Sequence, residues 1–275
     1  MITEAIRPIR PPCAFTTLRG TPQRSQLVKE ATHSERGFLH SIHTGSVVDG
    51  PGMRTVIWTT GCMLRCQYCH NPDTWHMKDG RPVTIDELMA EIRKYERFMK
   101  VTKGGITISG GEPLVQAPFV MRIMRECKDL GIHTVLDTNG FLTDRLSDDD
   151  LDAIDLVLLD IKSWIPETHL LATGQPVDPP LRFARRLDQL GKPAWIRFVL
   201  VPGLTDDPAN IDGLAGFVAS LTNVERVEIL PFHQMGASKW EKLGRAYPLK
   251  DRRAATEDDV AEAAGIFRSH GVEIA

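Results

Sequence analysis

Three cysteines lie within eight positions of one another in this sequence. They are Cys62, Cys66 and Cys69, in the stretch GCMLRCQYCHN (61–71). Only 5 of the 275 residues are cysteine, so chance rarely places two more of them four and seven positions after a given one. An odd number of cysteines, three of them close together, favours a metal site in a reducing compartment over a set of disulfides. We therefore expect a cytoplasmic protein whose chemistry depends on these thiols.

The number of thiols separates the kinds of metal site. A structural zinc ion normally has four protein ligands in two closely spaced pairs, and C-x3-C-x2-C has no distant C-x-x-C to complete it. His70 could supply a fourth zinc ligand, so that alternative stays open. A 4Fe-4S cluster is normally held by four thiolates, so a loop with three cysteines leaves one iron free to bind a small molecule. We predict such a cluster, with a chelating cosubstrate on its fourth iron.

Composition and charge exclude other classes of function. The chain has a net charge of -3 and its basic residues are scattered, which gives no bulk attraction to nucleic acid. No apolar run approaches the roughly 18 residues that a membrane span needs. We therefore expect no nucleic-acid partner and no membrane partner, and we expect a monomer.

The first 36 residues differ in composition from the rest. They lack the apolar stretch of a secretion signal. Their five arginines leave an organelle address open, but Glu4, Glu30 and Glu35 argue against one. We expect residues 1–36 to be a flexible N-terminal extension and residues 37–275 to form one domain.

Two periodicities alternate along the remaining chain. Short β-branched runs predict strands at 54–60, 105–109, 133–138, 156–162, 195–201 and 224–230, with GVEIA (271–275) ending the chain. Apolar residues at helical spacing predict helices at 84–99, 117–131, 180–191, 207–221 and 256–271. The first helix begins with a capping box, in which Glu87 follows Thr84 by three residues. Strand followed by helix, repeated about six times, predicts an α/β fold with a parallel sheet buried on both faces.

Polar motifs follow the ends of these predicted strands. In chain order they are GCMLRCQYCHN, SGGEP, DTNG, DIK, VPG and PFH. In parallel sheets the chemistry gathers at the carboxyl ends of the strands, in the loops that lead into helices. We therefore expect all six motifs to lie on one rim of the sheet.

The cysteine spacing and several other motifs resemble a known family. C-x3-C-x-aromatic-C, here with Tyr68 before Cys69, is the signature of radical S-adenosylmethionine (SAM) enzymes. Further stretches are similar in order and spacing to pyruvate formate-lyase activating enzymes, namely VVDGPGMR (47–54), CHNPDTW (69–75), SGGEPLVQ (109–116), DTNG (137–140), LLDIK (158–162), WIRFVLVPG (195–203) and LPFHQMGASKW (230–240). The resemblance covers residues 37–274 and leads us to expect a partial (β/α)6 barrel that is open on one side. A lateral gap of this kind can admit a peptide loop from another protein.

The resemblance also implies an activity. An external donor, a flavodoxin or a ferredoxin, would reduce the cluster, and SAM would then be cleaved to methionine and a 5′-deoxyadenosyl radical. The radical would remove a Cα hydrogen from one glycine of pyruvate formate-lyase, the protein substrate, and leave a glycyl radical. The alternatives are a radical SAM enzyme that activates another glycyl radical enzyme, or one that acts on a small molecule. Residues 70–108 contain no cysteine, whereas activating enzymes of other partners often carry a cysteine-rich insert there.

The same resemblance assigns roles to individual residues. Cys62, Cys66 and Cys69 would ligate the cluster. Gly110 and Gly111 would hold the SAM amino group, because a backbone without Cβ atoms can approach a ligand closely. Tyr68 and His70 would border the adenine. The structural alternatives are a plain Gly-Gly turn and a Tyr68 that packs beneath the cysteine loop.

Residues at the ends of later strands complete the implied site. The SAM-binding residues among them are Asp160, Ile161, Lys162 and His233. Because side chains alternate along a strand, Asp160 and Lys162 can both point into the barrel mouth while Ile161 points away. A buried structural ion pair is the alternative for the two charged residues. Asp137, Thr138 and Asp160 resemble a monovalent cation site beside the SAM carboxylate.

Two further motifs allow weaker expectations. Asp49 or Arg54, in VVDGPGMR, could position the incoming glycine loop, and a plain entry turn is the alternative. Cys127 is expected to be a buried side chain on a helix, and Cys13 an incidental thiol in the extension.

Overall fold

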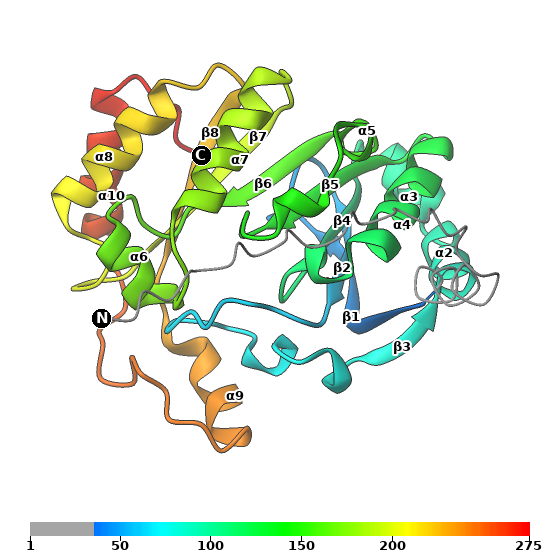
Figure 1. Ribbon diagram of the computed structural model, residues 1–275, viewed down its shortest axis with the longest axis horizontal. Coiled ribbons are helices and arrows are strands. Elements are labelled where there is room, and N and C mark those ends of the chain that lie inside the picture. The colour runs from blue at the N-terminus through cyan, green and yellow to red at the C-terminus, as the bar shows by residue number, and fades with distance from the viewer. Residues whose placement is uncertain (1–35) are drawn as a thin grey trace, which may run out of the picture.

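One eight-stranded sheet organises the chain. The computed structural model describes residues 36–275, and the strand order is β3-β1-β2-β4-β5-β6-β7-β8 (Figure 1). The strands are β1 (Arg36–Ser46), β2 (Arg54–Thr59), β3 (Arg81–Thr84), β4 (Gly105–Gly110), β5 (His133–Thr138), β6 (Leu156–Asp160), β7 (Ala194–Leu200) and β8 (Val224–Pro231). From β2 through β4 to β8 every neighbouring pair is parallel. The parallel strands, β2 and β4 to β8, are the six strands that the sequence predicted. The two edge strands, β3 and β8, do not pair with each other, so the predicted partial, unclosed barrel is confirmed.

Two strands were not predicted from the sequence. β1 pairs antiparallel with both β2 and β3 and extends the sheet beyond its parallel part. At the other edge, the last residues of the chain form a single bridge, between Val227 and Ile274, instead of a full strand. Residues 1–35 of the predicted extension lie outside the described residues, and Arg36 begins β1.

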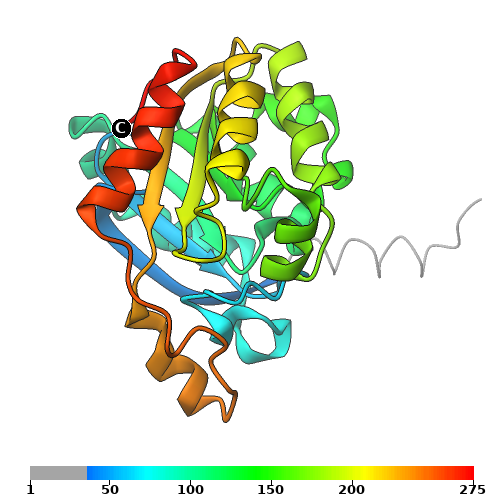
Figure 2. The same ribbon diagram turned by 90° about the vertical axis from the view of Figure 1, so that its left-hand side faces the viewer.

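Helices cover the outside of the sheet. They are α2 (Ile85–Arg93), α3 (Glu96–Val101), α4 (Ala117–Asp129), α5 (Asp148–Asp152), α6 (Pro166–Thr173), α7 (Asp178–Gln189), α8 (Pro208–Ala219), α9 (Ala237–Lys242) and α10 (Glu257–Ser269). Figure 2 shows α8 (yellow) and α10 (red) beside each other against β7 and β8. In Figure 1, α6 and α9 lie at the opposite end of the strands from the carboxyl terminus.

The first predicted helix is divided in two. Its amino end is as expected, because the Thr84 hydroxyl accepts from the Glu87 N–H and the Glu87 carboxylate accepts from the Thr84 N–H. The predicted helix 84–99 is nevertheless interrupted at Lys94 and Tyr95, and α3 follows as a separate short helix. Both pieces bury apolar side chains, namely Leu88, Met89 and Ile92 in α2 and Met99 in α3.

Apolar side chains fill both faces of the central strands. In β6, the four residues from Leu156 to Leu159 are at most 3% exposed. Val157 and Leu159 face the main core beneath the helices, whereas Leu156 and Leu158 join Val135 and Trp195 in a smaller cluster. The cavity described below lies beyond this packing, at the carboxyl ends of the strands.

None of the helices in residues 36–275 has the length and apolar content that crossing a bilayer requires.

Candidate active site

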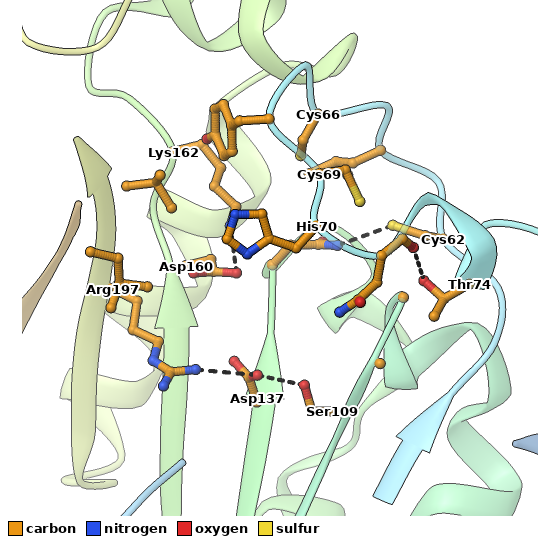
Figure 3. A pocket seen from close by; sticks show the side chains of 18 of the residues that line it. Cys62, Cys66, Cys69, His70, Thr74, Ser109, Asp137, Asp160, Lys162 and Arg197 are labelled. Carbon is orange, nitrogen blue, oxygen red and sulfur yellow. Dashed lines mark hydrogen bonds and ion pairs between the residues drawn. The ribbon is translucent and has the colours of Figure 1, made fainter. Parts of the chain in front are cut away.

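A cavity of about 420 Å³ lies at the carboxyl ends of the parallel strands. Figure 3 shows side chains from several strands and from the cysteine loop pointing into it. The predicted site residues that line it are Cys62, Cys66, Tyr68, Cys69, His70, Gly110, Gly111, Asp137, Thr138, Asp160, Lys162 and His233. Ile161 packs in the main core instead. Its side chain thus points away from the cavity, as the alternation along the strand predicted, and its assignment as a SAM-binding residue stays a prediction.

The cysteine loop is held on several sides by hydrogen bonds. The N–H groups of Gly61 and Cys62 donate to the carbonyls of Thr74 and Trp75, at 2.7 and 3.1 Å. Further along, the Arg65 N–H donates to the Thr173 carbonyl of α6 at 2.8 Å. These bonds fix the loop between α6 and the short 3-10 turn Pro72–Thr74, so its three thiols face one space.

The three thiols lie in a poorly solvated environment. Burial raises the pKa of Cys62, of Cys66 (to about 12) and of Cys69, and neighbouring thiols raise the first two further. The loop packs against an apolar cluster that includes Trp75, Phe232 and Trp240. Thiolates are therefore unfavourable here without a positively charged group between them, and a metal centre is such a group.

Gly110 and Gly111 are required by close backbone packing. Gly110 has a φ of +132°, and a Cβ there would lie 2.2 Å from the Thr59 carbonyl oxygen. A Cβ on Gly111 would lie 2.5 Å from the carbonyl oxygen of Gly61. The SGGE loop thus lies directly against the end of β2, while both glycines also line the cavity. Both explanations raised by the sequence, a tight turn and access to a ligand, fit this geometry.

Asp160 and Lys162 form an ion pair inside the cavity. The Lys162 ammonium lies 2.6 Å from the Asp160 carboxylate, and Lys162 Nζ is 5.9 Å from the centroid of the Tyr68 ring. Burial opposes the charge of Lys162, but the Asp160 carboxylate raises its pKa above the ordinary value. The two interpretations of these residues, a structural ion pair and a place in the barrel mouth, therefore both agree with the structure.

Two histidines from distant parts of the chain meet at the cavity wall. The rings of His70 and His233 have centroids 4.2 Å apart and are tilted by 33°. Burial, followed by His233, lowers the pKa of His70, which keeps that ring neutral near pH 7. Together the two rings form an aromatic surface at the cavity wall.

The predicted cation site is built around residues that already have partners. Asp137 accepts from the Ser109 hydroxyl at 2.6 Å and lies 3.3 Å from the Arg197 guanidinium. The Thr138 hydroxyl donates to Glu112. Within residues 36–275, no three His, Cys, Asp or Glu side chains are placed to hold a single metal ion. The cation site stays a prediction.

Comparison with known proteins identifies the family. The model of the radical SAM superfamily matches residues 56–212. The chain is also 45% identical over 235 residues to the curated pyruvate formate-lyase-activating enzyme of Staphylococcus epidermidis, covering 83% of this chain and 94% of that relative. This chain belongs to the radical SAM superfamily. Within it, the identity places the chain in the family of these activating enzymes, and the superfamily implies a 4Fe-4S cluster and SAM.

Solved structures agree with the radical SAM fold. A domain of pyruvate-formate lyase-activating enzyme from Bacteroides vulgatus has a TM-score of 0.51 and 26% identity, covering 62% of this chain and 98% of that one. Streptococcus suis SuiB bound to S-adenosylmethionine has a TM-score of 0.61 and 14% identity, covering 92% of this chain and 53% of that one. At 14% identity the second likeness concerns the fold alone.

The residues of this radical SAM chain fit a cluster and a cosubstrate. Three soft thiol ligands and the backbone of Gly110 and Gly111 line the same cavity. The hydroxyl of Tyr68 is buried at the cavity without a hydrogen-bond partner among the described residues. A polar ligand in the cavity would supply what this hydroxyl lacks.

Several cavity residues were not singled out from the sequence. They are Trp58, Trp75, Ser109, Asn139 and Arg197, with Glu112 directly behind the wall. Most of them lie inside motifs that the sequence did single out, such as SGGEP and DTNG, so the signal was their position after a buried strand. Their chemical roles depend on contacts across the sheet, which no local pattern reveals.

Asp49 and Arg54 have different positions in the structure. Asp49 lies 3.8 Å from Arg197, a residue of the cavity wall. Arg54 is fully buried at the start of β2, where it donates to the hydroxyl of Thr107 and the carbonyl of Ile106, and burial lowers its pKa to about 10. Arg54 therefore stabilises strand ends remote from the cavity and does not meet an incoming loop.

Proposed function

We propose that this chain activates pyruvate formate-lyase, as the names of its curated relatives indicate for them, and that it does so by forming a glycyl radical in the lyase. The observation that carries the proposal is the set of three thiols on one loop of a cavity at the carboxyl ends of parallel strands. Cys62, Cys66 and Cys69 would hold a 4Fe-4S cluster through three of its irons, and the remaining iron would be open to SAM. When bound, these groups supply a 5′-deoxyadenosyl radical that removes a glycine Cα hydrogen.

The charged residues of the cavity bind and orient SAM. The buried ammonium of Lys162 attracts its carboxylate, and Asp160 on the same strand end accepts from its ribose hydroxyls. Gly110 and Gly111 present backbone to its amino group. His70 stays neutral beside His233, so it does not repel the cationic sulfonium.

Apolar residues exclude water from the same space. Val199, Leu230 and Phe232 also line the cavity. A reactive carbon radical survives only where competing groups are kept away, so this wall directs it toward the substrate glycine. The unclosed sheet supports entry of a peptide loop, because a closed barrel would restrict access to small molecules.

The decisive test uses the reconstituted protein under anaerobic conditions. Mixed with SAM, a chemical reductant and pyruvate formate-lyase, it is expected to produce the doublet of a carbon-centred radical on the lyase in electron paramagnetic resonance (EPR) spectra. Cys66→Ala is expected to lose the cluster and all SAM cleavage, because one of three ligands is gone.

Cys127→Ala is the matched control for this test. Cys127 is buried in the core beneath α4, outside the cavity, so its loss should leave iron content and SAM cleavage intact. Turnover by Cys66→Ala would contradict the ligand assignment. SAM cleavage without a radical on the lyase would favour another glycyl radical partner or a small-molecule substrate.

We also propose that a flavodoxin or a ferredoxin supplies the electron, and that the protein works as a cytoplasmic monomer. Trp75 lines the cavity, and the guanidinium groups of Arg65 and Arg245 lie 4.9 and 5.0 Å from its ring centroid. Both arginines are exposed, and within the described part of the chain neither pairs with a carboxylate. This positive surface beside the cysteine loop suits an acidic redox protein.

Charge reversal tests the assignment of the donor. Arg245→Glu is expected to slow cluster reduction by reduced flavodoxin several-fold at low salt, and to leave reduction by dithionite unchanged. Arg268→Glu, at an exposed position of α10, is the control with the same charge change. Equal slowing by both variants would contradict a specific donor surface at Trp75.

A monovalent cation at Asp137, Thr138 and Asp160 remains part of the proposal. It is supported by the burial of Asp137, whose pKa is raised by that burial although Arg197 opposes the shift. SAM affinity that rises with potassium or sodium concentration at constant ionic strength is the expected result.

A further inference from the structure

Glu112 is a buried carboxylate that ties two strand-end loops to the cysteine loop. It is 1% exposed, and within residues 36–275 no cationic side chain pairs with it. Its carboxylate accepts from the Asn139 N–H at 2.9 Å and from the Thr138 hydroxyl at 2.8 and 3.0 Å. Its own N–H donates at 2.7 Å to the carbonyl of Gly61, the residue before the first cysteine. The DTNG loop is therefore fixed relative to the cysteine loop.

The side-chain amide of Asn139 is held in one orientation by this arrangement. Its Oδ1 accepts from the Phe141 N–H at 3.0 Å. Since only the oxygen of an amide can accept from an N–H, the NH2 group must face the other way. It donates to the Cys62 sulfur at 3.8 Å, one of the dashed contacts in Figure 3. Asn139 is 8% exposed, so little water competes for this contact.

Hydrogen bonds to ligand sulfurs affect how easily an iron–sulfur cluster is reduced. Reduction adds one negative charge to the cluster and its ligands, and an N–H that donates to a ligand sulfur stabilises that charge. Such a bond therefore raises the reduction potential. The contact between the Asn139 amide and the Cys62 sulfur is a bond of this kind.

We propose that Asn139 is a positioning residue that sets the reduction potential of the cluster. Its amide donates an N–H to the Cys62 thiolate, and Glu112 fixes the loop from which it donates. The proposal rests on the proposed function only for the presence of a 4Fe-4S cluster at the three cysteines. Its consequence is that a donor of given potential reduces a larger fraction of the protein than it would without this amide.

An EPR-monitored redox titration of two variants tests the proposal. Asn139→Leu removes the N–H with little change in side-chain size and without adding charge. At a fixed potential the ratio of reduced to oxidised cluster is expected to fall about tenfold. For a one-electron couple this corresponds to a reduction potential that is lower by about 59 mV. Asn139→Asp keeps the acceptor for the Phe141 N–H, and its potential should fall at least as far because a carboxylate adds negative charge.

Thr143→Val is the control for disturbance of the same loop. The Thr143 hydroxyl is buried and donates to the Gly140 carbonyl at 3.3 Å, without contacting sulfur. Its loss should leave the potential unchanged at full iron content. A shift in this variant as large as that of Asn139→Leu would show that loop disorder alone moves the potential, and would overturn the proposal.

A second measurement uses the unmodified protein. Asparagine labelled with ¹⁵N at the side-chain amide is expected to give a hyperfine coupling to the reduced cluster in pulsed EPR, and Asn139→Asp should lose it. No coupling in the parent protein, or an unchanged potential in iron-loaded Asn139→Leu, would overturn the proposal. If the variants bind no iron, the presence or absence of the coupling in the parent protein decides. A shifted potential in a protein that forms no glycyl radical would contradict only the proposed function.

Discussion

Lys162 is a buried ammonium group whose carboxylate partner is Asp160, at 2.6 Å. Its side chain is 11% exposed, so its charge interacts strongly with anything that enters the cavity. A ligand carboxylate would add a second negative charge beside the ammonium and replace lost hydration.

Lys162→Ala should weaken SAM binding without loss of iron. We expect the dissociation constant to rise at least tenfold, which corresponds to about 1.4 kcal/mol, because a charge-assisted contact is lost. Equilibrium dialysis with SAM and an iron assay measure the two quantities. Lys192→Ala is the control, because that amine donates to the Ile154 carbonyl, away from the cavity. Unchanged SAM affinity in Lys162→Ala would contradict the assignment.

For individual residues, the sequence predicted which side chains line the cavity better than it predicted which residues they contact. The thiols, the glycine pair and Lys162 were predicted because their spacing or their place after a buried strand is unusual. Asn139 and Glu112 were not, because their importance comes from hydrogen bonds between loops 26 to 77 residues apart in sequence.

Elements position the site through backbone contacts that tolerate no side chain. At the end of β4, Gly110 lies against β2 so closely that a Cβ would meet the Thr59 carbonyl oxygen at 2.2 Å. The neighbouring backbone belongs to a paired strand and cannot move aside cheaply. By contrast, Gly131 after α4 has a φ of +68° with no atom within 4 Å of an added Cβ.

Gly110→Ala should therefore destabilise the fold more than Gly131→Ala. We expect a loss on the order of 3 kcal/mol for Gly110→Ala, from overpacking added to left-handed strain. Gly131→Ala should cost about 1 kcal/mol, from the strain alone. Urea unfolding of the cluster-free proteins measures both values, and equal losses would contradict the role of the Thr59 contact.

The elements that the sequence failed to predict share a physical cause. β1 carries a half-exposed mixture of Gly, Ser and His, and β3 has only four residues including Pro82, so neither shows a buried β-branched run. In α6, Leu170 and Leu171 are exposed, so no apolar stripe marks the helix. The buried parallel strands and the amphipathic helices were predicted because burial on both faces, or on one, leaves a regular pattern.

At the scale of the whole molecule, Arg197 joins parts that are distant in sequence. Its guanidinium lies 3.0 Å from Glu228 on β8, 3.3 Å from Asp137 on β5 and 3.8 Å from Asp49 before β2. It also donates to the Val48 carbonyl at 2.6 Å. One buried cation thus connects three carboxylates across the interior of an unclosed sheet.

Arg197→Met should destabilise the protein by about 3 to 5 kcal/mol at pH 8, since it leaves buried carboxylates without their cation. Burial already raises the folded-state pKa of Asp137, and without the guanidinium that pKa rises further above its unfolded value. The cost in stability is therefore present at high pH and disappears as Asp137 binds a proton at low pH. The deficit should shrink between pH 8 and pH 5 in urea unfolding.

Arg226→Met provides the comparison for this prediction. Arg226 pairs with the same Glu228 at 2.8 Å but is 34% exposed, so its loss should cost about 1 kcal/mol or less. A deficit of Arg197→Met that does not change with pH would show that packing, not charge, explains it.

An unclosed sheet also presents free strand edges, along which copies of the chain could join and aggregate. Both edges are blunted here. β3 is four residues long and carries exposed Arg81 and Pro82, which discourage strand addition. On β8, the N–H and carbonyl of Val227 are already taken by Glu273 and Ala275 at the end of the chain. The fold thus leaves its sheet unclosed without exposing a long unpaired edge to strand addition.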